Sequence, residues 1–125
     1  MKIKESAENY LETIYMLQIK NGQVRSIDIA TELGYSKPSI SYAMKRFRED
    51  GYIIMDKNSM ISLTEKGQEI AERMYERHRL LSKYLISIGV SDEVAMQDAC
   101  RIEHVISAEA FEKIKEAVER GGSNL

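Results

Sequence analysis

Three residues in the last third of the chain, Cys100, Glu103 and His104, have the types and spacing of a metal-binding motif. On an α-helix, positions i, i+3 and i+4 fall within an arc of roughly 100°, one turn apart. A thiol, a carboxylate and an imidazole are ligands that divalent transition metals accept. The alternative is a helix with a small buried cysteine and a solvated Glu–His pair.

The sequence around this motif predicts a helix over residues 92–106. Ser91 is a good N-cap, and Asp92 and Glu93 place negative charge in the first turn, where the helix dipole favours it. An apolar stripe beside the candidate ligands consists of Val94, Ala95, Ala99, Ile102, Val105 and Ile106. The helix is therefore expected to carry all three ligands on one face.

A longer helix is predicted over residues 65–88, between the cap Thr64 and Gly89. Its apolar stripe is Ile70, Met74, His78, Leu81, Leu85 and Ile88. An imidazole in such a stripe is more often a core residue bonded to a neighbour than a metal ligand. However, the chain has only two histidines, and the other belongs to the Cys-x-x-Glu-His motif.

The composition is globular, with 43% hydrophobic and 30% charged residues among 125. This length suits one domain, or one small domain with an extension. We find no apolar run long enough to cross a membrane, and we expect no signal peptide. A single cysteine excludes an intrachain disulfide, fits a reducing cytoplasm and leaves the thiol available for a metal.

The net charge of -2 conceals a local basic run, in which Lys37, Lys45, Arg46 and Arg48 follow one another with no acid between them. A local basic face is enough for DNA binding, because affinity follows the phosphates that are contacted. The alternative for this run is a solvated helix face.

Three helices are predicted before and around this run, over residues 6–20, 26–33 and 36–50. Ser26 is expected to cap the second helix, whose buried side would include Ile27, and Gly34 to end it. Ser36 caps the third helix, and Pro38 lies in its first turn, where the missing N–H costs nothing. Two helices joined by a tight turn, the second basic and rich in hydroxyls, are typical of helix-turn-helix proteins, although an ordinary helical hairpin is the alternative.

A hairpin is predicted directly after these helices, with strands over residues 51–55 and 60–63 and Lys57 and Asn58 at its tip. The order helix, helix, helix, hairpin indicates a winged helix that binds double-stranded DNA. The candidate DNA-contacting residues are Ser36, Lys37, Pro38, Ser39, Ser41, Tyr42, Lys45, Arg46, Lys57 and Asn58.

The fold class expected is therefore mainly α: a winged helix-turn-helix domain over residues 1–63 and a helical domain over residues 64–125. A sixth helix is predicted over residues 108–120, followed by a frayed tail over 121–124. Three apolar-faced helices after the wing exceed what one small core needs, so we expect a homodimer.

The sequence resembles the diphtheria-toxin-repressor-like group of metal-dependent repressors, which includes the manganese transport regulators. The resemblance runs from about Glu5 to Lys115, and its most specific pieces are ENYLETIY at 8–15, LTEKG at 63–67, ERHRLL at 76–81 and ACRIEHVIS at 99–107. It implies a winged helix, a dimerisation domain and a divalent metal that switches on binding to a palindromic operator.

Carried over by position, the resemblance implies six metal residues: Asn9, Glu12, His78, Cys100, Glu103 and His104. Cys100 follows the iron-type members and Glu12 the manganese-type members, whereas Asn9 matches neither and offers a weaker, neutral oxygen. Ser82 and Met96 stand where the iron type carries a Glu and a His for an ancillary site. We therefore expect one principal metal site per subunit, and we expect no SH3-like third domain of the kind that some members have.

A thiolate among nitrogen and oxygen ligands favours Fe(II) over Mn(II), and binds Zn(II), Co(II) or Ni(II) in vitro. We therefore expect Fe(II) as the effector, with Mn(II) as the runner-up. By binding the DNA-competent state better, the metal would act as a coupled ligand. Three alternatives are a winged-helix regulator that senses oxidation of Cys100, a small metalloenzyme, and a structural dimer that never binds DNA.

Overall fold

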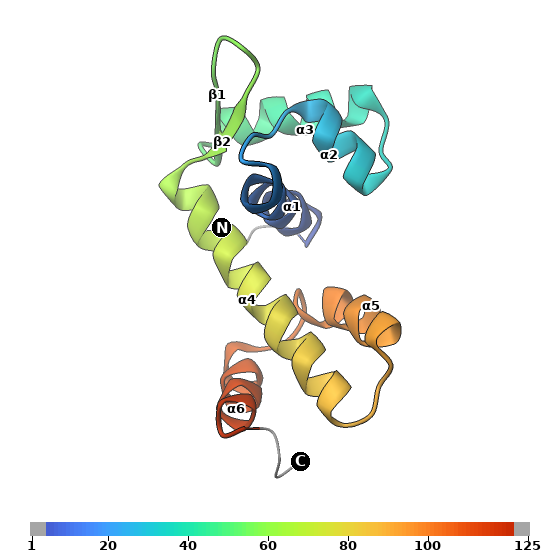
Figure 1. Ribbon diagram of the computed structural model, residues 1–125. Coiled ribbons are helices and arrows are strands. Elements are labelled where there is room, and N and C mark those ends of the chain that lie inside the picture. The colour runs from blue at the N-terminus through green and yellow to red at the C-terminus, as the bar shows by residue number, and fades with distance from the viewer. Residues whose placement is uncertain (1–4, 122–125) are drawn as a thin grey trace. The chain divides into compact units, whose positions relative to one another are not determined.

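The computed structural model describes residues 5–121, as six helices and one two-stranded sheet (Figure 1). In chain order these elements are α1 (Glu5–Asn21), α2 (Ser26–Leu33), α3 (Lys37–Glu49), β1 (Ile53–Met55), β2 (Ile61–Leu63), α4 (Glu65–Ser87), α5 (Asp92–Ile102) and α6 (Ala108–Glu119). The expected order of three helices, a hairpin and three further helices is confirmed. Of the tail expected to fray, residues 122–124 lie outside the described residues.

The chain forms two compact units, which divide between Arg73 and Met74, inside α4. The N-terminal unit holds α1, α2, α3, the hairpin and the first turns of α4. The C-terminal unit holds the rest of α4 with α5 and α6. No helix in the described range is long and apolar enough to cross a membrane.

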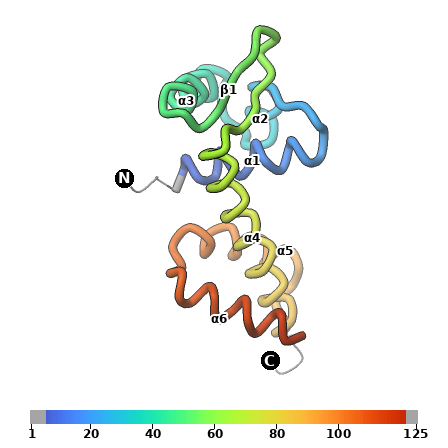
Figure 2. Tube along the Cα trace, turned by 90° about the vertical axis from the view of Figure 1, so that its left-hand side faces the viewer, coloured from blue at the N-terminus to red at the C-terminus, as the bar shows by residue number. Residues whose placement is uncertain are grey.

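The core of the N-terminal unit is built from one face of each of its helices and from the two strands. Figure 2 shows α1 beside α2 and the hairpin, and α3 next to β1. The buried apolar side chains are Leu11, Ile14, Leu17, Val24, Ile29, Ala30, Ile40, Met44, Phe47, Ile53, Ile61 and Ala71. Each large one contributes about 1.5–3 kcal/mol by its removal from water.

The turn between α2 and α3 has the predicted chemistry. Gly34 ends α2 in the left-handed region (φ 72°), which glycine adopts without strain. The Ser36 side chain caps α3 by accepting a hydrogen bond from the backbone N–H of Ser39. These two residues fix the path of the chain into α3.

The start of α2 differs from the prediction. Arg25, and not Ser26, is the N-cap residue, because the Asp28 carboxylate accepts a hydrogen bond from the Arg25 backbone N–H at 2.9 Å. An acid at the third helical position satisfies that donor from within the helix. The expected burial of Ile27 is also wrong, since this side chain is 50% exposed.

The hairpin consists of two short antiparallel strands, with Ile53 opposite Leu63 and Met55 opposite Ile61. Both are shorter than predicted. The Asp56 carboxylate holds the turn between them, because it accepts hydrogen bonds from the backbone N–H groups of Asn58 and Met60. The tip with Lys57 and Asn58 therefore has a defined shape.

The exit from the hairpin into α4 leaves no room for a side chain at Gly67. The Thr64 hydroxyl donates to the Gly51 carbonyl at 2.7 Å and accepts from the Gly67 N–H. A Cβ at position 67 would lie 2.1 Å from the Tyr52 carbonyl oxygen. The glycine allows the first turn of α4 to pack directly on the backbone that precedes β1.

In the C-terminal unit, α5 and α6 pack on the last turns of α4 around a small core of Met74, Leu81, Ala95, Ala99, Phe111 and Val118. The Ser107 side chain caps α6 by accepting from the Ala110 N–H at 3.0 Å. An ion pair between Lys115 and Glu76 joins α6 to α4. Several large apolar side chains stay exposed, among them Ile88, Val94 and Val105, which were expected in apolar stripes.

Candidate metal centre and DNA-binding surface

The Glu103 carboxylate is fully buried in the C-terminal unit, between two imidazoles. One of its oxygens lies 3.2 Å from Nδ1 of His78, and the other lies 3.4 Å from Nε2 of His104. Among the described residues, neither oxygen accepts a hydrogen bond. His78, which sequence reasoning left between a core and a ligand role, thus faces a carboxylate, together with the only other histidine of the chain.

The helix predicted over residues 92–106 is wrong over its last four residues, because α5 ends at Ile102. Glu103 is the C-cap residue, and His104 lies in the turn that follows. The Arg77 side chain takes the Glu103 carbonyl, which a longer helix would pair with the N–H of Ser107. Ser107 instead caps α6. These two candidate ligands are therefore placed by a turn and not by helical spacing.

The remaining candidate ligands lie elsewhere in the chain. Cys100 lies on α5, one turn before Glu103, and is exposed, so it is not a small buried core residue. Asn9 and Glu12 lie on α1, in the N-terminal unit. The six residues that the family resemblance implies are thus divided, with four in the C-terminal unit and two in the N-terminal unit.

The side chains of His78, Glu103 and His104 are of the types that hold a divalent cation, and the Glu103 carboxylate lies between the two imidazoles. A buried carboxylate without hydrogen bonds is costly in an apolar interior, and a cation would offset that cost. Two imidazole nitrogens and one carboxylate oxygen are also ligand types that transition metals accept. A bound metal would supply a positive charge that fixes these three side chains relative to one another.

The predicted DNA-contacting residues all lie on the surface of the N-terminal unit. Those from Ser36 to Arg46 lie at the start and along the outer face of α3, and Lys57 and Asn58 lie at the tip of the hairpin. The hydroxyl of Tyr42 accepts a hydrogen bond from Arg46 at 3.2 Å, which raises the pKa of that guanidinium. An exposed, basic, hydroxyl-rich helix is the type of element that enters a DNA groove.

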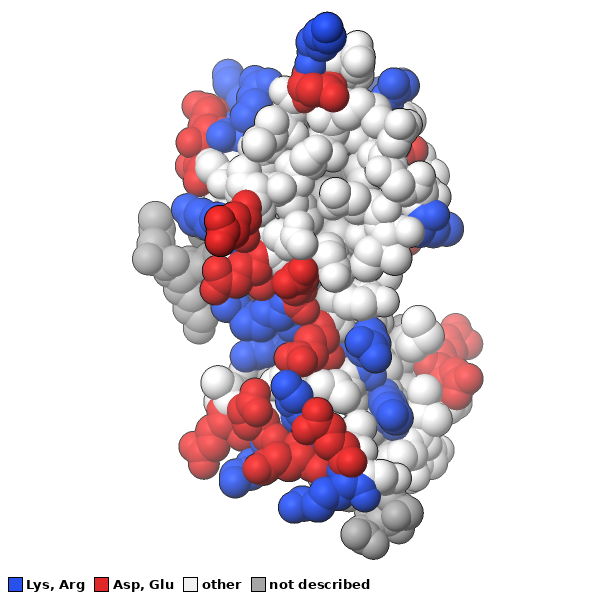
Figure 3. Space-filling model, turned by 60° about the vertical axis from the view of Figure 1, so that its left-hand side comes forward, with Lys and Arg blue, Asp and Glu red and all other residues white. Residues whose placement is uncertain are grey.

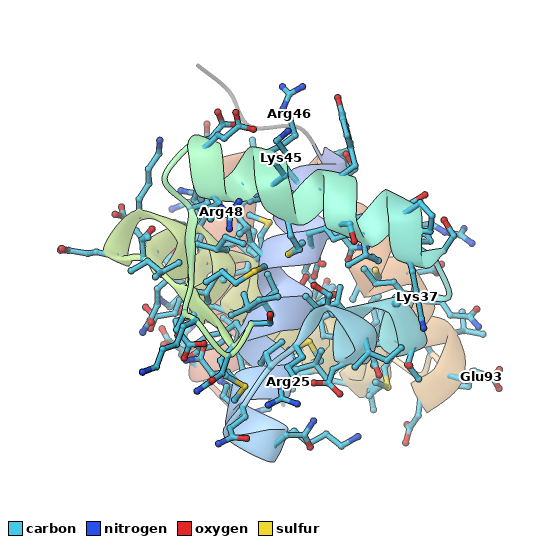
Figure 4. All side chains as sticks on the ribbon, turned by 90° about the horizontal axis from the view of Figure 1, so that it is seen from above. Arg25, Lys37, Lys45, Arg46, Arg48 and Glu93 are labelled. Carbon is cyan, nitrogen blue, oxygen red and sulfur yellow. The ribbon has the colours of Figure 1, made fainter. Side chains whose placement is uncertain are left out.

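A groove between α3, the start of α2 and the hairpin adds two basic residues that were not among the predicted contacts, Arg25 and Arg48 (Figure 4). Its lining is Arg25, Ser26, Ile27, Ser41, Met44, Lys45, Arg48, Met55 and Ser59, which includes three cations and no carboxylate. The Arg25 Nε donates to the Met60 sulfur, which ties this side chain to the hairpin. Nothing local marks Arg25, since it lies outside the basic run and only the fold brings it to α3.

The charge of the C-terminal unit differs from that of this groove. Figure 3 shows acidic side chains gathered over one face of this unit, with Lys and Arg side chains among them. Two pairs on α6 are Lys113 with Glu116 and Lys115 with Glu76 of α4. This mixed face is a poorer match for a polyanion than the groove on the N-terminal unit, which carries three cations and no carboxylate.

Two family models match the chain over nearly all of its length. Residues 2–61 match the iron dependent repressor N-terminal DNA binding domain, and residues 64–121 match the iron dependent repressor metal binding and dimerisation domain. The chain belongs to the iron-dependent repressor family. Members of this family are metal-dependent transcriptional regulators of metal homeostasis and not enzymes, so the expected function class and the winged-helix fold are confirmed.

Curated relatives of this repressor-family chain are transcriptional regulators named MntR. It is 32% identical to the transcriptional regulator MntR of Salmonella typhimurium over 97% of its own length and 77% of the relative. It is 36% identical to the HTH-type transcriptional regulator MntR of Geobacillus kaustophilus, over 91% of its own length and 81% of the relative. The expected preference for Fe(II) gains no support from these relatives.

Solved structures of the family share this fold. The manganese regulator SloR matches 95% of the chain with a TM-score of 0.78 and 26% identity, and a manganese-dependent transcriptional repressor in complex with manganese matches 90% with a TM-score of 0.80 and 26% identity. The chain spans about half the length of these solved proteins, 55% and 52% respectively.

Proposed function

We propose that this protein is a metal-gated repressor, which binds a palindromic operator as a homodimer in the cytoplasm once a divalent metal occupies the site at Glu103. The observation that carries the proposal is the fully buried Glu103 carboxylate, which faces two histidines and has no hydrogen bond among the described residues. Family membership supplies the DNA-binding and dimerisation functions.

The proposed metal ligands are His78, Glu103 and His104, with Cys100 from α5. Glu12, and more weakly Asn9, are added on the family resemblance. We also propose the functional boundary after residue 63, so that the DNA-binding domain ends with the hairpin and the metal-binding domain begins with α4. A metal held by ligands from both domains would favour one arrangement of the two, and hence the DNA-competent state.

The identity of the metal depends on which ligands join Glu103. A coordinated Cys100 thiolate would favour Fe(II) over Mn(II), because softer ligands raise the affinity for metals later in the first-row series. Relatives named for manganese favour Mn(II). We propose that both ions activate the protein, with Fe(II) the tighter ligand and cellular supply deciding the physiological effector.

The gating test is DNA binding by fluorescence anisotropy with a random duplex pool, without metal and under anaerobic Mn(II) or Fe(II). We expect metal to tighten binding by about 5- to 150-fold, the usual range of allosteric coupling. His104→Ala should lose this gain, whereas Val105→Ala, an exposed neighbour in the same turn, should keep it. Half-activating concentrations then rank the ions. Equal binding with and without metal would reject the gating.

A second candidate function, sensing of oxidation, is favoured by the exposure of the Cys100 thiol. In that case peroxide would change DNA binding, Cys100→Ser would abolish the change, and a chelator would have no effect. The metal-gated function makes the opposite prediction for the chelator. The same anisotropy assay therefore separates the two functions.

The DNA surface makes a separate prediction. If Arg25 and Arg48 of the groove contact phosphates, Arg25→Ala and Arg48→Ala should each reduce the slope of log K against log salt by about 0.9, because each lost contact releases one counterion fewer. Lys113→Ala, which removes the same charge from α6, should leave the slope unchanged. A uniform loss of affinity with no change in slope would place both arginines outside the phosphate contacts.

A further inference from the structure

We infer that Arg77 is the positioning residue of the metal centre: it fixes the turn that carries Glu103 and His104, and so determines metal affinity without being a ligand. The inference rests on the proposed function for the metal itself. We call the contacts of Arg77 with this turn the clamp. These contacts are present in the metal-free chain.

The guanidinium of Arg77 contacts both ends of the turn. Its Nη1 donates to the Glu103 carbonyl at 3.0 Å and to the Ile106 carbonyl at 3.2 Å. Its guanidinium carbon lies 5.4 Å from the ring centre of Phe111 on α6. One side chain of α4 therefore joins the C-cap residue of α5, the end of the turn and the next helix.

Backbone hydrogen bonds define only part of this turn. After the bond from the Glu103 N–H to the Ala99 carbonyl, the N–H groups of Val105 (i to i−3) and Ile106 (i to i−4) both bond to the Ile102 carbonyl. The Glu103 and Ile106 carbonyls accept hydrogen bonds from Arg77. Without the guanidinium, these partly buried acceptors would need water, and the turn would sample other conformations.

Arg77 and His78, which are adjacent on α4, both contact Glu103. Arg77 holds the backbone of Glu103, and His78 faces its carboxylate at 3.2 Å. A metal site requires its ligands to be held close to their bound geometry, and loss of supporting contacts typically weakens binding by 10- to 100-fold. The clamp supplies that support for two of the three converging side chains.

The test compares Arg77→Met with Arg79→Met. Arg79 lies two residues further along α4, is exposed and stacks on Tyr75, so its removal costs the same charge without touching the turn. Mn(II) and Co(II) affinities are measured by titration calorimetry at a temperature at which circular dichroism shows each metal-free variant folded. We expect Arg77→Met to weaken binding at least tenfold and to alter the Co(II) visible spectrum, and Arg79→Met to stay within twofold of the wild type.

Arg77→Lys provides the rescue, because an ammonium group on a long stem can still donate to carbonyls, and it should recover part of the lost affinity. A purely structural role would lower the melting temperature of Arg77→Met but leave its metal affinity at low temperature unchanged, and that result overturns the inference. An equal loss in Arg79→Met would also overturn it, because the effect would then be one of overall charge.

Amide hydrogen exchange in the metal-free proteins tests the clamp independently of any metal. The N–H groups of Val105 and Ile106 should exchange at least tenfold faster in Arg77→Met, with α6 amides unaffected. If the wild type binds no metal, the proposed function fails, and this exchange result still decides the clamp. Unchanged exchange would reject it.

Discussion

Replacing Glu103 with glutamine should abolish tight metal binding while leaving the metal-free protein as stable as before or more so. The carboxylate is fully buried and accepts no hydrogen bond among the described residues, so its charge costs free energy in the absence of a cation. Loss of a ligand should weaken metal affinity by at least about 100-fold, since changing a residue that only supports a ligand costs roughly 10- to 100-fold.

Two measurements check this prediction. Titration calorimetry gives the Mn(II) affinity, and thermal unfolding at pH 8 with excess EDTA gives the stability of the metal-free protein. The matched control is Glu93→Gln, at an exposed carboxylate in the first turn of α5 that points away from the protein in Figure 4. It should change metal affinity less than twofold. A metal-free Glu103→Gln protein that melts well below the wild type would show that the two histidines already compensate the carboxylate.

Replacing Gly67 with alanine should destabilise the N-terminal unit strongly, although the same change in a helix normally stabilises by up to about 1 kcal/mol. The added methyl would lie 2.1 Å from the Tyr52 carbonyl oxygen. Relief requires α4 to move from the backbone before β1, which breaks the Thr64 hydrogen bonds to Gly51 and Gly67. Overpacking of this kind costs about 1–3 kcal/mol, and the lost hydrogen bonds add to that.

Thermal unfolding followed by circular dichroism measures the effect, and we expect a fall in melting temperature of roughly 4–8 °C for each kcal/mol. Gly22→Ala provides the contrast. Gly22 has φ +79° and open space around it, so its cost comes from backbone conformation alone, about 1 kcal/mol. A Gly67→Ala protein that melts at or above the wild-type temperature would show that the packing of α4 on Tyr52 is unimportant.

The fold could be predicted from the sequence because the residues that begin and end its helices act through local contacts. Ser36 and Pro38 begin α3, Gly34 ends α2 and Ser107 begins α6, each through contacts within a few residues. Of the three side chains that meet in the C-terminal unit, Glu103 and His104 were proposed as ligands from residue type and spacing, whereas His78 became a candidate ligand through the family resemblance. Signals of this kind can be read from neighbouring residues alone, and the tertiary structure is consistent with them.

The end of α5 could not be predicted, because no helix-breaking residue lies between Ile102 and Ser107. The cause is Arg77, 26 residues before Glu103, which takes the carbonyl that would continue the helix. Arg25 escaped notice for the same reason, since its partner Met60 lies 35 residues further along the chain. The hydrophobic periodicity of a segment does not reveal contacts that its residues make with a side chain of another element.

The hydrogen bonds that Arg77 donates to main-chain carbonyls bear on which substitutions this turn tolerates. Every amino acid carries the same carbonyl, so the hydrogen bonds at positions 103 and 106 do not depend on which side chains stand there. The path of the backbone is therefore independent of the side chains at the proposed ligand positions. If these positions hold the metal as proposed, substitutions there would change the ligand chemistry, and with it the preferred metal, while the turn itself is preserved.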